Sequence, residues 1–204
     1  FRVGVCLGTT VASQLNDLEA YKRYRKTREM PLSSVDRYLD SNLAEAVAGQ
    51  FLAFGPRVTV VNACSSGTDA IGIGYAWLKQ GYCDMVIAGG ADELNHVPYC
   101  GFVSLGVVSP EPCAPFDRDR KGLNLGEGAG IVILENGEHA RKRGMKPGIF
   151  VSGFGSAADA YHLTAPRPDG SGRESALKQA LAEAGADDRD VSFINAHGTA
   201  TRDN

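Results

Sequence analysis

The sequence predicts an α/β fold, because strand-like and helix-like segments alternate along most of the chain. The central observation is a β-branched run, Val58 to Val61, which stops at small residues and is followed by a helical pattern reaching Gly81. A second apolar run, residues 85–91, reads as another strand. Strand, helix and strand in this order imply a parallel sheet with both faces covered by helices.

Apolar periodicity and the proline and glycine breaks give the other elements of the first part. In chain order we expect a strand at 2–8, a helix at 14–29, a second helix ended by Gly55-Pro56, a strand at 57–62 and a helix at 66–80. Ser34 or Asp36 is a candidate N-cap for the second helix. Its core-facing residues are expected to be Leu43, Ala44, Val47, Ala48, Phe51 and Leu52.

Residues 92–125 read as a long irregular loop, a kind of segment that is usually functional in a compact domain. The glycine-rich run 126–130 then opens into a strand at 131–135. A dinucleotide fingerprint opens a helix instead, so close backbone packing explains these glycines better than nucleotide binding. A short helix at 138–143 follows, and its basic residues read as a solvated face.

A domain boundary is expected near Lys146-Pro147-Gly148, dividing the chain into parts 1–145 and 146–204. The second part should contain a strand at 149–155, a helix at 172–184 and a strand at 191–195. One face of this helix carries Ala176, Leu177, Ala180, Leu181 and Ala184.

The composition is typical of a soluble globular protein, with 43% hydrophobic residues to form a core and a net charge of −3. Such a charge gives no general attraction to nucleic acid or to anionic membranes. No apolar run approaches the ~20 residues of a membrane span and no signal-peptide pattern is present, so we expect a cytoplasmic location. The chain starts at Phe1 within a predicted strand and ends just past a motif, so we expect an internal part of a longer protein.

The cysteines and histidines give no metal-binding pattern. No two cysteines have C-x-x-C spacing and no two histidines have H-x-x-x-H spacing, which disfavours zinc ribbons and thioredoxin-like motifs. An odd number of irregularly spaced cysteines fits reduced thiols in the cytosol. The cysteines are Cys6, Cys64, Cys83, Cys100 and Cys113.

Cys64 stands where a predicted strand breaks into the helix at 66–80, which should leave its thiol exposed. Unpaired N–H groups and the partial positive charge of the helix N-terminus favour a thiolate there. Cys64 is therefore a candidate nucleophile. The alternative is a buried, inert cysteine that packs as a small hydrophobic residue, and the local pattern leaves both open.

A short repeat links Cys64 to a histidine. Each half of the chain carries a β-rich run that ends in Asn-Ala and a reactive residue: Asn62-Ala63-Cys64 in one and Asn195-Ala196-His197 in the other. Two similar βα units could place both residues at corresponding strand ends, facing one crevice of the kind in which ligands bind.

Six motifs together resemble those of the β-ketoacyl-acyl-carrier-protein synthases, most closely the bacterial KAS II-like condensing enzymes of the thiolase superfamily. The resemblance runs through nearly the whole chain, with the motifs in the right order and spacing. The motifs are NACSSG (62–67), VIAGGA (86–91), PFDRDRKG (115–122), LGEGAG (125–130), DAYH (159–162) and NAHGTAT (195–201).

The resemblance implies a thiolase-like α/β fold, in which two related βαβ halves form a layered α/β/α/β/α arrangement and the whole enzyme is a homodimer. Residues 1–145 would be part of the N-terminal half, which carries the nucleophile Cys64. Residues 146–204 would begin the C-terminal half, with His197 as the first of two catalytic histidines. The substrate-binding positions implied in the same way are Phe102, Thr199, Thr201, Thr164 and His162.

Among these positions, Phe102 matches a pocket residue that controls access of the acyl chain, with a plain core residue as the alternative. Thr199 and Thr201 match threonines that contact the pantetheine arm, and Thr164 and His162 would lie along the same entrance. The basic run 118–121 fits a solvated face better than a contact to a carrier protein or partner subunit.

The reaction implied by the resemblance is a decarboxylative Claisen condensation in fatty acid or polyketide chain elongation. An acyl group passes from a carrier thioester to Cys64 through a tetrahedral intermediate, which the Cys64 N–H helps to stabilise. Malonyl carrier protein then loses carbon dioxide, and the resulting enolate, stabilised by His197, attacks the acyl group. The partners would be acyl carrier protein and its acyl and malonyl thioesters. No metal or redox cofactor is required, because phosphopantetheine arrives on the carrier.

Two other functions stay open. The first is another thiolase-fold acyltransferase acting on acyl-CoA, against which the Asn-Ala-His-Gly-Thr run argues. The second is a non-catalytic partner subunit of a polyketide synthase pair, against which the presence of Cys64 argues. Ser65-Ser66 is more typical of polyketide-type synthases, so the fatty acid and polyketide pathways both remain possible.

Overall fold

The computed structural model describes residues 1–11, 18–30, 32–33, 36, 42–162 and 164–204. The chain forms two compact units. Unit 1 contains Phe1–Pro98 and Glu127–Gly148, and unit 2 contains Tyr99–Gly126 and Ile149–Asn204. The division into parts 1–145 and 146–204 stays a prediction.

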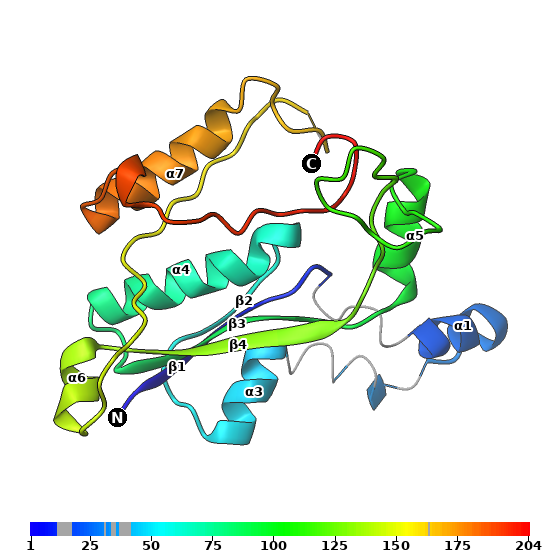
Figure 1. Ribbon diagram of the computed structural model, residues 1–204. Coiled ribbons are helices and arrows are strands. Elements are labelled where there is room, and N and C mark those ends of the chain that lie inside the picture. Colours follow the sequence, from blue (N-terminus) through cyan, green and yellow to red (C-terminus); the bar gives the residue numbers. More distant parts are fainter. Residues whose placement is uncertain (12–17, 31, 34–35, 37–41, 163) are drawn as a thin grey trace. The chain divides into compact units, whose positions relative to one another are not determined.

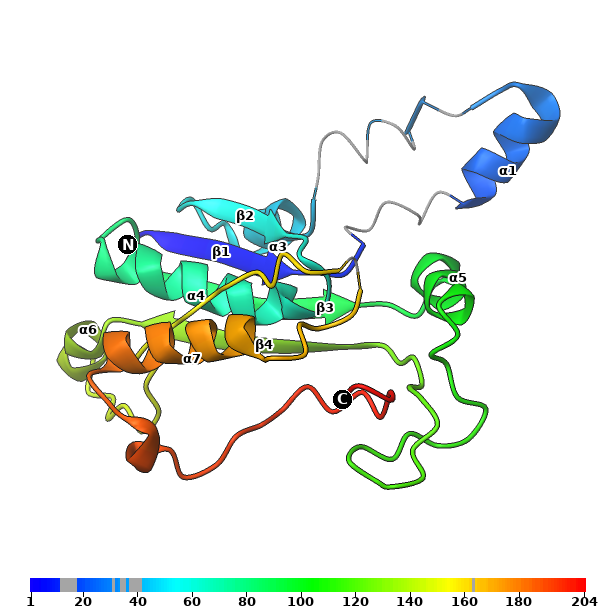
Figure 2. The same cartoon turned by 90° about the horizontal axis from the view of Figure 1, so that it is seen from above.

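Unit 1 is built on a four-stranded sheet with the strand order β2-β1-β3-β4 (Figures 1 and 2). Its strands are β1 (Val3–Gly8), β2 (Arg57–Val60), β3 (Met85–Asp92) and β4 (Gly128–Glu135). β1 runs parallel to both β2 and β3, as expected, whereas β4 runs antiparallel to β3. The prediction of a parallel sheet was therefore wrong for β4. The register pairs Asp92 with Gly128, so the chain returns to the sheet at the end where β3 leaves it and must run backwards.

Helices cover both faces of this sheet, which confirms the prediction of a doubly covered sheet. Figure 1 shows α3 (Leu43–Phe51) and α4 (Ser66–Lys79) on opposite sides. Side chains alternate along β1, so Val5 and Leu7 pack towards α3 while Cys6 packs towards α4. The core on the α3 side contains Val5, Leu7, Ala44, Ala48 and Ala53, and that on the α4 side contains Cys6, Ala70, Cys83, Val86 and Ala88.

The helix α3 begins and ends differently from the prediction. Its N-cap is Asn42, whose side-chain oxygen accepts a hydrogen bond from the Glu45 N–H. The predicted cap Asp36 lies well before the helix, and Ser34 lies outside the described residues. Phe51 and Leu52 were expected in the core, but they are 68% and 72% exposed. The chain reverses at Leu52, which has a left-handed backbone, so Ala53 closes the core in their place.

Two further helices depart from the sequence prediction. α1 covers Leu18–Thr27, and residues 14–17 of the helix predicted at 14–29 lie outside the described residues. α5 (His96–Ser104) lies where an irregular loop was expected. Periodicity did not indicate it, because apolar residues fall on several sides of the helix and none of its residues is buried.

The short helix α6 (Gly137–Lys142) begins where β4 ends, and two of the basic residues predicted as a solvated face, His139 and Arg143, bind Glu135 instead. Arg143 donates to both carboxylate oxygens of Glu135, at 2.8 Å from Nη2 and 2.9 Å from Nε. His139 Nδ1 lies 2.5 Å from the same carboxylate. The Arg143 hydrogen bonds, and then that of His139, hold the pKa of Glu135 at about 2.

We expect Glu135→Gln to reduce the free energy of unfolding at pH 7 by about 1–2 kcal/mol, a modest amount because Arg143 is half exposed. The folded-state pKa is depressed, so the stabilisation is present above the unfolded-state pKa near 4.5 and is lost as pH falls towards 2. Urea unfolding of the full-length protein at pH 7 and pH 3 measures this difference. Glu138→Gln, which removes the exposed Glu138–Lys142 pair, should have almost no effect. Equal pH dependence of wild type and Glu135→Gln would contradict the assignment.

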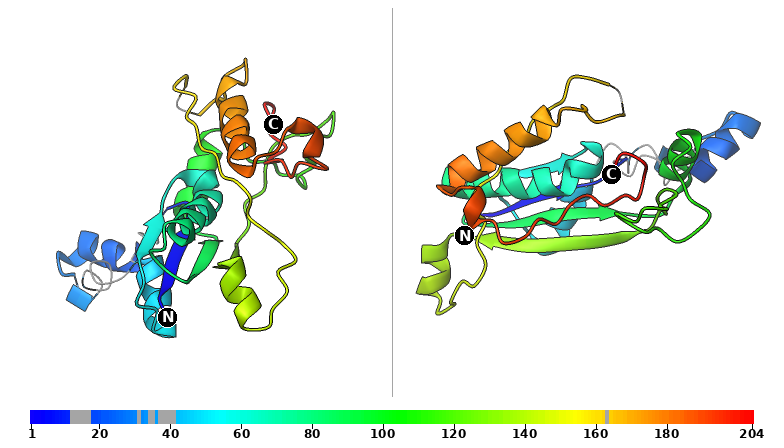
Figure 3. Two further views of the ribbon diagram at one scale, coloured as in Figure 1. Left: turned by 90° about the vertical axis from the view of Figure 1, so that its left-hand side faces the viewer. Right: turned by 45° about the horizontal axis from the view of Figure 1, so that its top comes forward.

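Unit 2 contains α7 (Ser171–Ala184) and a short 3-10 helix at Asp188–Asp190. The segment 149–155 runs along α7, where Phe154 N donates to Glu183 and Ser156 N donates to Gln179. Figure 3 shows this segment, in yellow, beside α7, in orange. The predicted strands at 149–155 and 191–195 are wrong, because neither segment has strand structure. A strand needs a paired neighbour, and within the described residues neither segment joins a ladder.

The helices of the described residues include none that is both long enough and apolar enough to cross a membrane.

Candidate functional site

Cys64 lies in a 3-10 turn, Ala63–Ser65, between the end of β2 and the start of α4. Its side chain is exposed, which confirms the exposure predicted for a residue at a strand-to-helix turn. The preceding residue, Ala63, has a φ of 50°, a left-handed conformation that costs an L-residue roughly 1–2 kcal/mol. Such strain persists only where the surrounding structure fixes it, and it is concentrated at functional sites.

A hydrogen-bond network fixes this turn. The Asn62 side-chain amide donates to Asp69 at 2.7 Å and to Ser65 at 2.9 Å, and the Ser65 hydroxyl donates to Asp69 at 2.8 Å. The buried Ser66 hydroxyl accepts from the Asn62 N–H and donates to the Ala63 carbonyl, both at 2.7 Å. Cys64 thus sits in a turn whose flanking residues are held on both sides.

Asp69 was not singled out from the sequence as a site residue. Its distance of four residues from Ser65 on the helix is a usable signal, because residues i and i+4 share one helix face. The presence of serine at position 66 has a structural explanation, because its hydroxyl closes the turn from inside. This explanation is the same for a fatty acid and a polyketide pathway.

The second predicted catalytic residue, His197, lies in unit 2 and is exposed. The residues after it form a compact turn. The Asn204 side chain accepts from Gly198 N at 2.8 Å and Thr199 N at 3.3 Å. Gly198 has a φ of 62°, which favours glycine, and so the residue after His197 has to be small and permissive.

The structure brings Thr199 and Thr201 together. Their hydroxyl oxygens lie 2.8 Å apart and both residues are half-buried. The intervening Ala200 is completely buried, so the two threonines flank a fixed point in the turn. Two hydroxyls at this distance provide a joint donor and acceptor for an amide-containing ligand.

His162 and Thr164 also lie together, in an exposed loop before α7. His162 Nδ1 accepts hydrogen bonds from Thr164 N at 3.1 Å and from Ala165 N at 3.0 Å. These two hydrogen bonds hold the imidazole ring against the backbone of residues 164–165. Phe102 lies on α5 and is half-buried, and control of acyl-chain access by this residue stays a prediction.

The two predicted catalytic residues belong to different units, Cys64 to unit 1 and His197 to unit 2. Their convergence on one crevice therefore stays a prediction. Within the described residues, no cluster of three or more Cys, His, Asp or Glu side chains is arranged to hold a metal ion.

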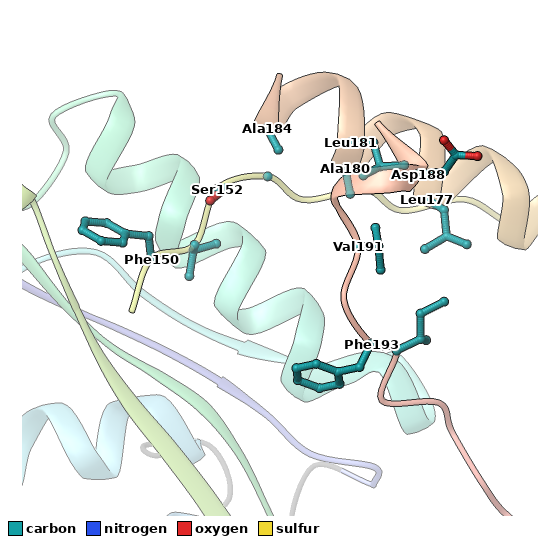
Figure 4. Close-up of a pocket in the computed structure, with 12 residues that line it drawn as sticks. Phe150, Ser152, Leu177, Ala180, Leu181, Ala184, Asp188, Val191 and Phe193 are labelled. Carbon is teal, nitrogen blue, oxygen red and sulfur yellow. The ribbon is translucent and has the colours of Figure 1, made fainter. Parts of the chain in front are cut away.

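An apolar cavity of about 830 Å³ lies within unit 2 and contains none of the predicted site residues. Figure 4 shows its lining, which comes from α7 and from the extended segments before and after it. Leu177, Phe150 and Phe193 are among the lining residues and are 54%, 65% and 83% exposed. The predicted apolar face of α7 lines this cavity instead of a closed core, because no strand covers it within the described residues.

The five thiols differ sharply in their surroundings. Burial raises the pKa of Cys6 to about 12 and also raises the pKa of Cys83, so both stay protonated near neutral pH. Cys64 and Cys100 are exposed and Cys113 is half-buried. Cys6 and Cys83 are therefore buried core residues with a structural role.

We expect iodoacetamide at pH 8 to alkylate the exposed Cys64 and Cys100 far faster than Cys6, because the thiolate is the reacting species and burial raises the pKa of Cys6 to about 12. Peptide mass mapping after brief labelling of the native protein measures each site. In urea all five thiols should react alike, which is the control for peptide detection. Native labelling of Cys6 as fast as that of Cys64 would show that β1 is not the buried strand described above.

The structure thus combines an α/β sheet and a thiol at a strained strand-to-helix turn in unit 1 with a His-Gly-Thr-Ala-Thr turn in unit 2. The Beta-ketoacyl synthase N-terminal domain matches residues 1–140, and the Beta-ketoacyl synthase C-terminal domain matches residues 149–204. The chain belongs to the β-ketoacyl synthase family.

Relatives in sequence bear the name 3-oxoacyl-[acyl-carrier-protein] synthase 2. The protein from Staphylococcus aureus is 33% identical over 208 residues, which cover 98% of this chain and 52% of the relative. The protein from Rhizobium meliloti (strain 1021) is 43% identical over 155 residues, which cover 72% of this chain and 37% of the relative. The chain thus spans about half the length of the curated relatives it matches.

Solved structures agree with the sequence relatives and confirm the thiolase-like fold. The ishigamide ketosynthase/chain length factor matches with a TM-score of 0.91 and 31% identity, over 100% of this chain and 51% of that chain. The AntDE:AntF structure, described as a type II PKS acyl-carrier protein in complex with its ketosynthase bound to the hexaketide, has a TM-score of 0.92 and 29% identity. It is matched over 100% of this chain and 53% of that chain.

Proposed function

We propose that the full-length protein is a β-ketoacyl-acyl-carrier-protein synthase, an acyltransferase that elongates acyl chains by decarboxylative condensation. The observation that carries this proposal is the exposed Cys64 on a turn fixed by Asn62, Ser65 and Asp69. Family membership supports it, as do the names of the relatives.

In the first half-reaction, the Cys64 thiolate attacks the carbonyl carbon of an acyl thioester. The tetrahedral intermediate collapses with loss of the carrier thiol, and the acyl group remains on Cys64 as a thioester. Backbone N–H groups at the turn are the natural donors to the oxyanion, because the turn is rigid before substrate arrives.

In the second half-reaction, the malonyl thioester loses carbon dioxide and its electron pair becomes an enolate. His197 donates a hydrogen bond to the enolate oxygen, and the enolate carbon attacks the acyl group on Cys64. Expulsion of the Cys64 thiolate gives the β-ketoacyl product and frees the enzyme. The paired hydroxyls of Thr199 and Thr201 bind the pantetheine arm that carries the malonyl group.

The partners follow from this chemistry. The acyl and malonyl groups arrive on acyl carrier protein, whose phosphopantetheine supplies the thiol, so no further cofactor is needed. One related ketosynthase has been solved with its acyl-carrier protein, which supports this choice of partner. We further propose a cytoplasmic homodimer, with Phe102 controlling access of the acyl chain and His162 and Thr164 along the entrance.

A second candidate is the ketosynthase subunit of a type II polyketide system. The structural similarity to the ishigamide ketosynthase/chain length factor and to AntDE:AntF favours it. The chemistry at Cys64 is the same in both cases, and the difference lies in the acyl group accepted.

Condensation by the full-length protein tests the proposal. Acyl carrier protein loaded with an acyl group and acyl carrier protein loaded with a malonyl group are supplied together. The β-ketoacyl product is detected by mass spectrometry. We expect turnover with wild type and none with Cys64→Ala. Equal product with both proteins would exclude Cys64 as the nucleophile. Absence of product with every acyl donor, from a correctly folded protein, would favour the non-catalytic partner subunit.

A further inference from the structure

The guanidinium group of Arg120 donates hydrogen bonds to three backbone carbonyl groups. Nε donates to the Thr201 carbonyl at 2.9 Å, Nη2 to the Arg202 carbonyl at 2.7 Å and Nη1 to the Asp117 carbonyl at 3.1 Å. The side chain is half-buried. A planar guanidinium can join several acceptors at once, whereas a lysine ammonium acts as a point charge.

The neighbours of Arg120 in sequence behave differently. Lys121 forms an exposed ion pair with Glu111. Arg118 is exposed, and in the part of the chain that the structure describes it makes no hydrogen bond or ion pair. The basic run 118–121 is therefore mostly the solvated face expected from the sequence, with Arg120 as the exception.

Other residues of the same loop also hold the turn that follows His197. The Cys113 thiol lies 3.5 Å from the Thr199 carbonyl as a donor. Gly198 faces Pro115 and Phe116, whose atoms would lie 3.5 Å and 3.7 Å from a Cβ at that position. The loop 113–120 thus forms one wall against residues 198–202, and Arg120 supplies its charged hydrogen bonds.

We infer that Arg120 is a positioning residue for the condensation half-reaction, an inference that rests on the proposed function. It fixes the carbonyls of Thr201 and Arg202, which fixes the Thr199–Thr201 hydroxyl pair and the backbone leading back to His197. Arg120 itself touches no reacting atom. Its loss would displace the histidine and the pantetheine-binding threonines while leaving the Cys64 turn unchanged, since the residues that fix that turn are Asn62, Ser65, Ser66 and Asp69.

The test measures the two half-reactions of the full-length protein separately. Transfer of an acyl group from loaded acyl carrier protein to Cys64 is followed by the intact mass of the enzyme. Decarboxylation of malonyl-loaded acyl carrier protein is followed by the release of carbon dioxide. For Arg120→Ala we expect acylation at the wild-type rate and decarboxylation slowed about 100-fold, the effect of displacing a catalytic group by about 1 Å. Arg120→Lys should recover part of this loss, because an ammonium can replace one of the donors.

Arg118→Ala is the matched control, since it removes a guanidinium from the same loop and none of the carbonyl contacts. It should leave both half-reactions unchanged. Decarboxylation by Arg120→Ala within about twofold of wild type would overturn the inference while the proposed function stands. An equal loss in both half-reactions would also overturn it, because that is the result of general destabilisation. Absence of acylation and decarboxylation in wild type would instead contradict the proposed function.

Discussion

In the full-length His197→Ala variant, we expect Cys64 to be acylated at the wild-type rate and the condensation rate to fall about 10²–10³-fold. This is the cost of removing one oxyanion donor. The reason is a division of labour. In the proposed mechanism, Cys64 and its fixed turn carry out acyl transfer, whereas the hydrogen bond from His197 is needed only when the malonyl enolate forms. Acylation followed by intact mass and condensation followed by product formation separate the two steps.

A control for this variant is His139→Ala. His139 lies on α6 beside Glu135, and it has no part in the proposed chemistry. It should keep full condensation activity despite a small loss of stability. If His197→Ala condensed as fast as wild type, the assignment of the enolate donor to His197 would be wrong.

Gly8→Ala is expected to lower the free energy of unfolding by about 2–4 kcal/mol, at the upper end of overpacking effects. Gly8 ends β1 directly against the start of α4. A Cβ at Gly8 would lie 2.2 Å from the Ser66 carbonyl carbon and 2.3 Å from its oxygen. The backbone of Ser66 cannot rotate away as a side chain would, so the strand and the helix have to separate. Since Ser66 closes the Cys64 turn, acylation should fall as well, by about 10- to 100-fold.

Gly49→Ala is the matched control, because Gly49 is an exposed residue of α3 with no atom within 4 Å of the added Cβ. Alanine in a helix interior should raise the free energy of unfolding by about 0.5–1 kcal/mol. Urea unfolding of both variants and of wild type gives the comparison. Gly8→Ala as stable as wild type would mean that β1 and α4 do not meet at Ser66.

The sequence predicted the elements whose patterns are local. The strand β3 and the helices α4 and α7 were expected within one or two residues of their observed limits, because their periodicity extends over several turns or a whole strand. The exposure of Cys64 also followed from a local feature, the break from strand to helix.

Features that depend on distant residues were missed. The antiparallel direction of β4 depends on where the chain returns to the sheet, and the exposure of Phe51 depends on the turn at Leu52. The predicted strand 191–195 has a strand-like sequence but no paired neighbour within the described residues. Arg120 could not be separated from Arg118 by sequence, because two of its three carbonyl partners are about 80 residues away.

The central claim is that Cys64 carries the acyl group. The direct measurement is peptide-level mass mapping of the full-length protein after brief exposure to acyl carrier protein that carries an acyl thioester. The Cys64→Ala variant is treated in parallel. The account predicts one acyl adduct, on the peptide that contains Cys64, and no adduct with the variant. An adduct on the other exposed thiol, Cys100, or the same adduct in Cys64→Ala, would contradict it.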